Sequence, residues 1–267
     1  MKIYDCFTFN DENDLLEIRI NCLKDIVDFF VIVECKYTHQ GNIKGKKIDS
    51  RILDKFKHRI KYFYIDKKID SNNSWEIEAW QRNQLSMGLN SCQPDDIIIV
   101  SDLDEIPNLD NFSFDNIGKK VFAFDQALLM YKLNLVRNRR WIGSKICKFL
   151  VLKSPQWLRQ LKVHKRYSFL RLDKFFSKTY YHKFEIIKNG GWHFGWLRSS
   201  SEIIEKVQSY AHTEHNIPRF KDKNYIDSCI KNNINFLNGF EKMKKLDDEN
   251  LPKYIKENLE KYKKWMI

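Results

Sequence analysis

The sequence predicts an α/β fold in which a mainly parallel central sheet is flanked by helices. Short β-branched and aromatic runs alternate with amphipathic segments over the first hundred residues, and each run ends at polar residues. Strands that alternate with helices in this way favour parallel pairing, because the helix carries the chain back across the sheet. With 267 residues, 43% of them hydrophobic, the chain can bury the core of one large domain.

The first half is expected to contain four strands separated by three helices. In the first helical segment Leu15, Ile18 and Cys22 recur on one face, after acidic residues that suit a helix N-terminus. The expected strands cover residues 2–9, 27–34, 60–66 and 96–102, and the expected helices cover residues 10–25, 51–59 and 74–90. Ligands of open α/β sheets bind at the carboxyl ends of the strands. The polar residues that close these strands should therefore share one rim, namely Asn10, Glu34, Asp66 and Asp102.

The second half is less regular. Longer strands are expected at residues 121–134 and 179–187, an aromatic stretch at 190–196, and helices at 200–211 and 222–236. We expect residues 1–240 to form a single domain and residues 241–267 to form a basic helical tail packed on it. A membrane-surface anchor is the less favoured interpretation of that tail.

Positive charge is concentrated in the middle of a chain whose net charge is +12. Residues 132–188 contain sixteen Lys or Arg against two acidic residues, Asp173 and Glu185. This segment favours an anionic partner, for which nucleic acid, an anionic membrane, a phosphorylated glycan and a nucleotide diphosphate all qualify. A solvated basic face without a partner is an equal alternative.

Cysteine usage and hydropathy bear on the compartment. The six cysteines are dispersed, and most have apolar neighbours, which indicates reduced core thiols rather than disulfides or zinc ligands. No apolar run reaches the ~18 residues of a membrane-spanning helix, and the first residues turn acidic where a signal peptide would be apolar. We therefore expect a cytoplasmic protein, with peripheral contact at the inner face of a membrane as a further expectation.

The segment "DDIIIVSDLDEIP" (95–107) carries the strongest chemical signal. Along extended chain, residues two apart point to the same side, so Asp102 and Asp104 can converge on one cation. Paired carboxylates suit Mn²⁺ or Mg²⁺, which then hold the phosphates of a substrate. Asp-based phosphotransferases and phosphatases also use an Asp-x-Asp after a strand. Their motif follows the first strand, however, whereas this one follows three earlier strands and continues Glu-Ile-Pro, so phosphotransfer is the second hypothesis.

Four motifs, in order, resemble glycosyltransferase family 17: "FNDENDLLEIRINCLKDIVDFFVIVE", "QRNQL", "PDDIIIVSDLDEIP" and "GGWHFGW". The resemblance spans residues 7–236. It implies a GT-A type, Rossmann-like fold and inverting transfer of a sugar, GlcNAc being the expected one, from a UDP-sugar to a glycan or glycolipid. Animal members are anchored Golgi proteins, so this chain resembles a bacterial or viral member.

The resemblance also implies roles for individual residues. Asp102 and Asp104 match the metal and donor-diphosphate motif, and His193 would complete the metal shell. Taken alone, a His in an aromatic strand is more often a core residue, but the two preceding glycines would let the backbone approach a ligand. Glu34 lies where such folds bind uridine. Arg82 and Asn83 match an Arg-Asn pair before the metal motif, with an exposed helix charge as the equal alternative for Arg82.

An inverting enzyme needs a group that deprotonates the acceptor hydroxyl. The candidate bases are Glu214, Glu105 and Asp222, and Glu214 ranks first. The basic middle segment favours an anionic acceptor such as a bacterial surface glycan. A nucleic-acid-binding module is the third hypothesis, with aromatic residues in and beside that segment stacking on bases, namely Tyr131, Trp141, Trp157, Tyr167 and Phe169. No nucleic acid is expected, because the five acids of residues 95–105 would then lie beside a polyanion.

Overall fold

The computed structural model describes residues 1–161, 184–208 and 212–267, and its centre is one ten-stranded sheet. The strand order is β3-β2-β1-β4-β7-β6-β9-β5, with β10 beside β7 and β8 beside β6. The strands are β1 Ile3–Phe9, β2 Phe29–Cys35, β3 Ile60–Ile65, β4 Ile97–Val100, β5 Glu105–Pro107, β6 Val121–Met130, β7 Leu135–Lys148, β8 Phe184–Ile187, β9 Gly191–Gly195 and β10 Lys244–Lys245. The predicted α/β class is confirmed, but the sheet is mixed: β3, β2, β1 and β4 are parallel, whereas β7 is antiparallel to both β4 and β6.

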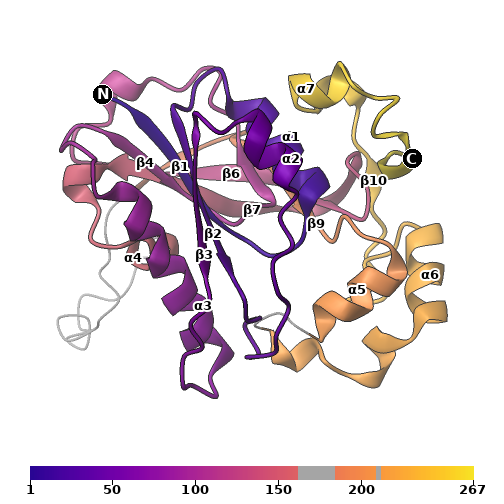
Figure 1. Ribbon diagram of the computed structural model, residues 1–267. Coiled ribbons are helices and arrows are strands. Elements are labelled where there is room, and N and C mark those ends of the chain that lie inside the picture. The colour runs from indigo at the N-terminus through magenta and orange to yellow at the C-terminus, as the bar shows by residue number, and fades with distance from the viewer. Residues whose placement is uncertain (162–183, 209–211) are drawn as a thin grey trace, which may run out of the picture.

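Helices cover both faces of the sheet (Figure 1). They are α1 Asn13–Leu23, α2 Ser50–Lys55, α3 Ser74–Asn83, α4 Pro155–Gln160, α5 Ser200–Val207, α6 Lys223–Lys231 and α7 Lys253–Lys256. Because side chains alternate along a strand, β1 supplies both layers of the core. Phe7 packs with Leu16 of α1, whereas Cys6 packs with Leu85 and Leu158 on the opposite face. A third cluster joins α5 and α6 to the end of β6.

The largest difference from the sequence prediction is β7. One long strand was expected at residues 121–134, but β6 ends at Met130, Tyr131 takes a left-handed φ of 65°, and the chain returns as β7. This strand was not predicted, because the exposed basic residues of the segment "RNRRW" (137–141) break the alternation of apolar and polar residues. β5 was also missed, since three residues carry no periodicity.

Several expected helices are shorter than the sequence pattern suggested. Residues 84–89 continue α3 as a 3-10 helix. α6 ends at Lys231, and Asn233 then takes a left-handed φ of 56°, a common helix terminator. In the tail, only α7 and the 3-10 turn Lys263–Trp265 are helical after Pro252.

The tail contacts α1 and the β6–β7 turn. Trp265 Nε1 donates to Asp14 Oδ2 over 2.8 Å, and Leu133 N donates to the Trp265 carbonyl over 2.8 Å. Lys261 pairs with Glu17 at 2.6 Å. Within the described ranges, no helix is both long and apolar enough to cross a lipid bilayer.

Candidate functional site

A cavity of ≈ 920 Å³ opens at the carboxyl ends of β1, β2 and β4. Asn10, Asp102 and Asp104 line it, together with side chains from β6, β7 and β9. The parallel register of β1, β2, β3 and β4 brings their carboxyl ends to one edge, as the sequence indicated. Of the four residues expected on this rim, Glu34 and Asp66 do not belong to the described lining.

The loop after β4 is held from inside the protein by Arg19, which is fully buried. Its guanidinium group forms a two-pronged ion pair with Asp5 of β1, at 2.7 and 2.6 Å. It also donates to four oxygens of the loop: the carbonyls of Asp102 (3.0 Å), Leu103 (3.1 Å) and Glu105 (2.8 Å) and the hydroxyl of Ser101 (2.5 Å). This side chain therefore determines where the carboxylates of the loop point.

Arg19 was not predicted to support the site, although two features of the sequence indicate it. Asp5 interrupts the apolar run of β1, and Arg19 stands between Ile18 and Ile20 on a helix that faces the core. A charge at a core position requires a partner of opposite charge, so the two residues together predict a buried ion pair.

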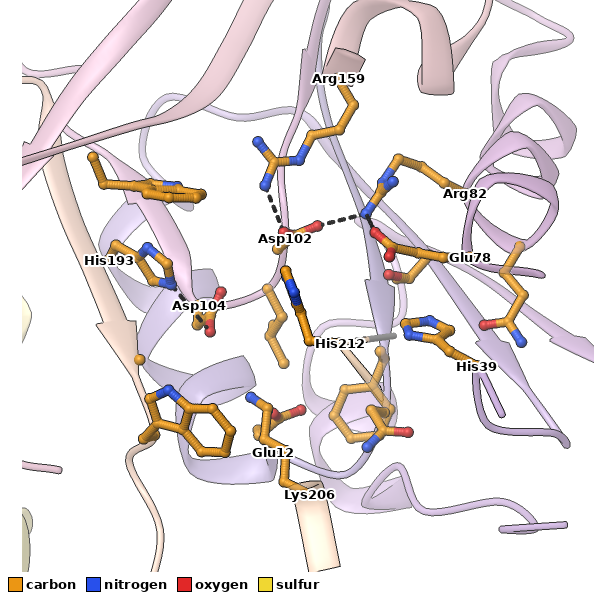
Figure 2. A pocket seen from close by; sticks show the side chains of 18 of the residues that line it. Glu12, His39, Glu78, Arg82, Asp102, Asp104, Arg159, His193, Lys206 and His212 are labelled. Carbon is orange, nitrogen blue, oxygen red and sulfur yellow. Dashed lines mark hydrogen bonds and ion pairs between the residues drawn. The ribbon is translucent and has the colours of Figure 1, made fainter. Parts of the chain in front are cut away.

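Asp102 lies between two arginines. Its Oδ1 accepts from Arg82 over 2.9 Å, and its Oδ2 accepts from Arg159 over 2.6 Å (Figure 2). Burial alone would raise the pKa of the Asp102 carboxyl, but the Arg159 and Arg82 guanidinium groups hold that pKa well below its usual range. Asp102 is therefore ionised. Arg82 is buried and also pairs with Glu78, so it is not an exposed helix charge.

Asp104 points instead toward His193, whose Nε2 lies 3.5 Å from Asp104 Oδ2 (Figure 2). Pairing of β5 with β9 creates this approach, since Glu105 is opposite His193 and Phe194 N donates to the Asp104 carbonyl over 2.8 Å. Burial alone would lower the pKa of His193, but the Asp104 carboxylate raises it. Within the described residues, the buried His193 Nδ1 has no hydrogen-bond partner.

Residues 1–266 match the family model described as glycosyltransferase family 17. The chain belongs to this family. The resemblance found in the motifs is thus confirmed, and family membership supports the predicted enzyme class, a glycosyltransferase.

Curated relatives of this family 17 chain share its sequence only distantly. The rat and human proteins named beta-1,4-mannosyl-glycoprotein 4-beta-N-acetylglucosaminyltransferase are each 23% identical to it. These similarities cover 86% of the chain and 47% of the rat protein, and 89% of the chain and 47% of the human protein. The chain spans about half the length of the curated relatives it matches.

The three acids considered as bases in this family 17 chain occupy different surroundings. Glu105 is fully buried and accepts from Trp141 Nε1 (2.5 Å) and Arg159 Nη2 (2.8 Å), so it supports the cavity wall from behind. Glu214 is exposed beside the cavity, on the 3-10 turn Thr213–His215. Asp222 caps α6 by accepting from the backbone N–H of Asn224 over 2.9 Å.

Two residues expected to bind the donor are engaged inside the protein. Glu34 is fully buried and accepts from Lys47 N (2.5 Å), Tyr62 Oη (2.7 Å) and Lys44 Nζ (3.2 Å). Asn83 Oδ1 accepts from Gln156 N over 3.1 Å, which ties α3 to α4. Neither belongs to the described lining, whereas Lys44 does and could transmit an effect of Glu34 to a ligand.

Much of the basic middle segment is neutralised within the protein or lies outside the described residues. Arg137 pairs with Glu241, Arg140 with Asp125, and Lys148 with Asp95, at 2.6–2.7 Å. Residues 162–183, with seven of the sixteen basic side chains, fall outside the described ranges. Of the aromatic residues considered for base stacking, Tyr131 is buried and Trp141 lines the cavity, whereas Tyr167 and Phe169 also fall outside those ranges.

Lys145 of β7 provides a pH-dependent test of the cavity wall. It is 3% exposed and donates to the carbonyls of Arg159 and Leu161. Burial, helped by the charge of Arg159, lowers its pKa from 10.5 to about 7. Between these two values Lys145 binds more protons in the unfolded chain than in the folded one, so its contribution to the free energy of unfolding should rise with pH, by up to about 1.4 kcal/mol per pH unit.

We therefore expect Lys145→Met to remove this rise between pH 7 and 10, as measured by urea unfolding across that range. Lys148→Met, in the same strand but paired at the surface with Asp95, is the matched control and should keep the rise. Equal pH dependence in Lys145→Met and wild type would contradict this prediction.

Proposed function

We propose that this chain transfers a sugar from a nucleoside-diphosphate donor to a glycan or glycolipid acceptor, with a divalent metal bound beside the donor. The observation that carries the proposal is a cavity lined by two neighbouring groups of side chains. One is the Asp104–His193 pair, and the other is Asp102 with the two arginines that it binds. Its position at the carboxyl ends of the parallel strands supports a GT-A type arrangement. UDP-GlcNAc is the proposed donor, since the similar rat and human proteins are named as N-acetylglucosaminyltransferases.

The side chains of the cavity fit a metal ion, but the ligands differ from the three that the sequence predicted. Asp104 and His193 present an oxygen and a nitrogen to the same point, whereas both oxygens of Asp102 accept from guanidinium groups. Asp104 and His193 would thus hold the ion, and Asp102 would orient Arg82 and Arg159. Because Mg²⁺ prefers oxygen ligands, this set favours Mn²⁺ over Mg²⁺.

The chemistry requires stabilisation of negative charge on the leaving diphosphate. When bound, the metal ion would neutralise part of that charge. Arg82 and Arg159 line the cavity, and their fixed fork geometry suits phosphate oxygens. Asp102 and Glu105 hold the Arg159 guanidinium group at 2.6 and 2.8 Å, so it is positioned before a ligand arrives. Transfer with inversion then needs a base on the acceptor side.

The acceptor is proposed on the charge of the chain. An anionic surface glycan, reached at the inner face of a membrane, remains the favoured class on charge. Arg137, Arg140 and Lys148 of the basic segment pair with acids of the same chain. Attraction of an anionic acceptor therefore depends on the other basic residues of the segment. Activity toward neutral glycans but not toward phosphorylated or acidic ones would contradict the anionic class.

The alternatives have less support. An Asp-based phosphotransferase needs a carboxylate oxygen that attacks phosphorus, and both oxygens of Asp102 are engaged by arginines. A nucleic-acid module leaves the cavity and the Asp104–His193 pair without a role.

Calorimetric titration of UDP and UDP-GlcNAc, with and without Mn²⁺, tests the proposed function. We expect Mn²⁺ to strengthen nucleotide binding in the wild type. Asp104→Asn should weaken the Mn²⁺-dependent part by at least about 10-fold, because a neutral amide is a weaker ligand than a carboxylate. Asp110→Asn, an exposed acid six residues away, is the control and should bind as the wild type does.

Absence of metal-dependent binding of both nucleotides by the wild type would contradict the proposed function. Salt-sensitive RNA binding in its place would favour the nucleic-acid alternative.

A further inference from the structure

A histidine–carboxylate pair, His212 and Glu214, lies at the cavity. Resting on the proposed function, we propose that His212 accepts the proton of the acceptor hydroxyl and that Glu214 holds His212 in position. Glu214 was the first-ranked base in the sequence, but it is 59% exposed and does not belong to the described lining. His212 does belong to that lining, so the carboxylate would act through the imidazole.

Contacts with three described side chains hold the His212 ring. Nδ1 lies 2.6 Å from Glu214 Oε1, the Trp75 ring meets the imidazole edge-on with centroids 4.6 Å apart, and the His215 ring stacks on it at 5.5 Å and 17°. The turn itself produces the stacking, because His215 N donates to the His212 carbonyl over 3.1 Å, and residues three apart in a 3-10 turn face the same way. The ring orientation is thus built in before a substrate binds.

The carboxylate also selects the tautomer of the ring. An ionised Glu accepts hydrogen bonds but cannot donate them, so the proton between the two residues belongs to His212 Nδ1. In the neutral ring Nε2 is then the basic nitrogen. Figure 2 shows His212 within the cavity, between Asp104 and His39, where an acceptor hydroxyl could reach it.

Two other histidines of the cavity, His39 and His193, suit this role less well. His193 lies beside Asp104, with which it would hold the metal ion, so its Nε2 would be occupied by that ion. Burial lowers the pKa of His39, which keeps that ring neutral, but no hydrogen bond within the described part of the chain orients it.

The acids that line the cavity each have a cationic partner. Burial alone would raise the pKa of Glu12, but Lys206 and Arg198 hold that pKa well below its usual range. Glu78 pairs with Arg82, and Asp102 pairs with two arginines. Asp104 would hold the metal ion together with His193. A carboxylate stabilised in its charged form is a weak proton acceptor, so His212 remains the better base.

The proposed step is balanced without a further reactant. The acceptor oxygen forms a bond to the anomeric carbon of the sugar, and its proton passes to His212 Nε2. The bond from that carbon to the diphosphate oxygen breaks, and the diphosphate leaves with the electron pair. The imidazolium that forms is stabilised by the Glu214 carboxylate at 2.6 Å.

The first test compares turnover with donor binding. We expect His212→Ala to lower kcat for UDP release from UDP-GlcNAc by about 100-fold, with water as the acceptor, while the calorimetric Kd for UDP stays unchanged. Added imidazole should restore part of the rate, which a purely structural role would not allow. Glu214→Gln should lower kcat about 10-fold with an unchanged Kd. His58→Ala, at an exposed loop position, is the matched control and should turn over normally.

The second test needs no turnover. Long-range ¹⁵N–¹H NMR of the His212 ring should show the proton on Nδ1, and Glu214→Gln should change that spectrum. A proton on Nε2 would overturn the proposal, as would normal kcat in His212→Ala.

A third outcome concerns metal binding, because the ligand atoms of His212, Glu214 and His215 lie within 4.8 Å of one another. Tight binding of Zn²⁺ that is lost in His212→Ala would also overturn the proposal. Failure of the proposed function can be told apart from failure of the His212 proposal. In the first case the wild type would show no metal-dependent nucleotide binding, which would overturn the proposed function and the role of His212 together.

Discussion

Arg19→Met is expected to lower the free energy of unfolding by about 3–5 kcal/mol, the usual cost of removing one partner from a buried ion pair. The substitution leaves the Asp5 carboxylate fully buried without its cation. It also removes the donor shared by the carbonyls of Asp102, Leu103 and Glu105. Urea unfolding at pH 7 measures the first effect. We expect the Mn²⁺-dependent binding of UDP to weaken in folded protein as well, since the loop that presents Asp104 loses its support.

A matched control separates burial from ion pairing. Arg51 pairs with Asp49 over 2.6 Å, the same distance as in the Arg19–Asp5 pair, but the Arg51 side chain is 89% exposed. Arg51→Met should leave stability unchanged within error, because solvent screens an exposed pair. The double variant Asp5→Asn with Arg19→Met should recover part of the lost stability, since no unpaired charge stays buried. Equal effects of Arg19→Met and Arg51→Met would contradict this account.

The strands and helices of the first half were predictable because their local pattern agrees with their environment. Apart from the buried Asp5 and Glu34, β1, β2 and β4 are largely apolar on both faces, as parallel strands between two helical layers must be, and their polar ends mark the rim. Asn10, Asp102 and Asp104 were placed correctly at the cavity for this reason. The family could be read from the motifs, because residues 95–107 and 190–196 combine an uncommon sequence with a definite spacing.

What could not be predicted depends on contacts between distant residues. Arg159 reaches Asp102 from α4, 57 positions away along the chain, and nothing near either residue indicates the pair. The same holds for β5 and β9, whose pairing brings Asp104 to His193. His212 and Glu214 are two positions apart in the sequence, but only the folded chain shows that the imidazole, and not the carboxylate, lines the cavity.

The glycines before His193 illustrate the same limit. They were expected to let the backbone approach a ligand, but they let two strands of the protein approach each other. A Cβ on Gly191 would lie 2.2 Å from the carbonyl oxygen of Ile106 and 2.7 Å from Asn108 N, both on or next to β5. Gly191 also has a φ of 124°, which L side chains rarely adopt.

Gly191→Ala is therefore expected to lower the free energy of unfolding by about 3 kcal/mol or more, since an unfavourable φ and a backbone clash both oppose the new methyl group. Separation of β5 from β9 would also move Asp104 away from His193, so Mn²⁺-dependent UDP binding should fall in protein that still folds. Urea unfolding and calorimetry measure the two effects.

Gly45→Ala is the matched control for the backbone term. Gly45 also has a positive φ, 69°, but a Cβ there would meet nothing within 4 Å, so we expect a cost of only about 1 kcal/mol and normal nucleotide binding. The difference between the two alanine variants then measures the close contact of β5 with β9. If both variants lost the same stability, the contact would contribute nothing. The Asp104–His193 geometry would in that case have to be maintained by the Arg19 loop alone.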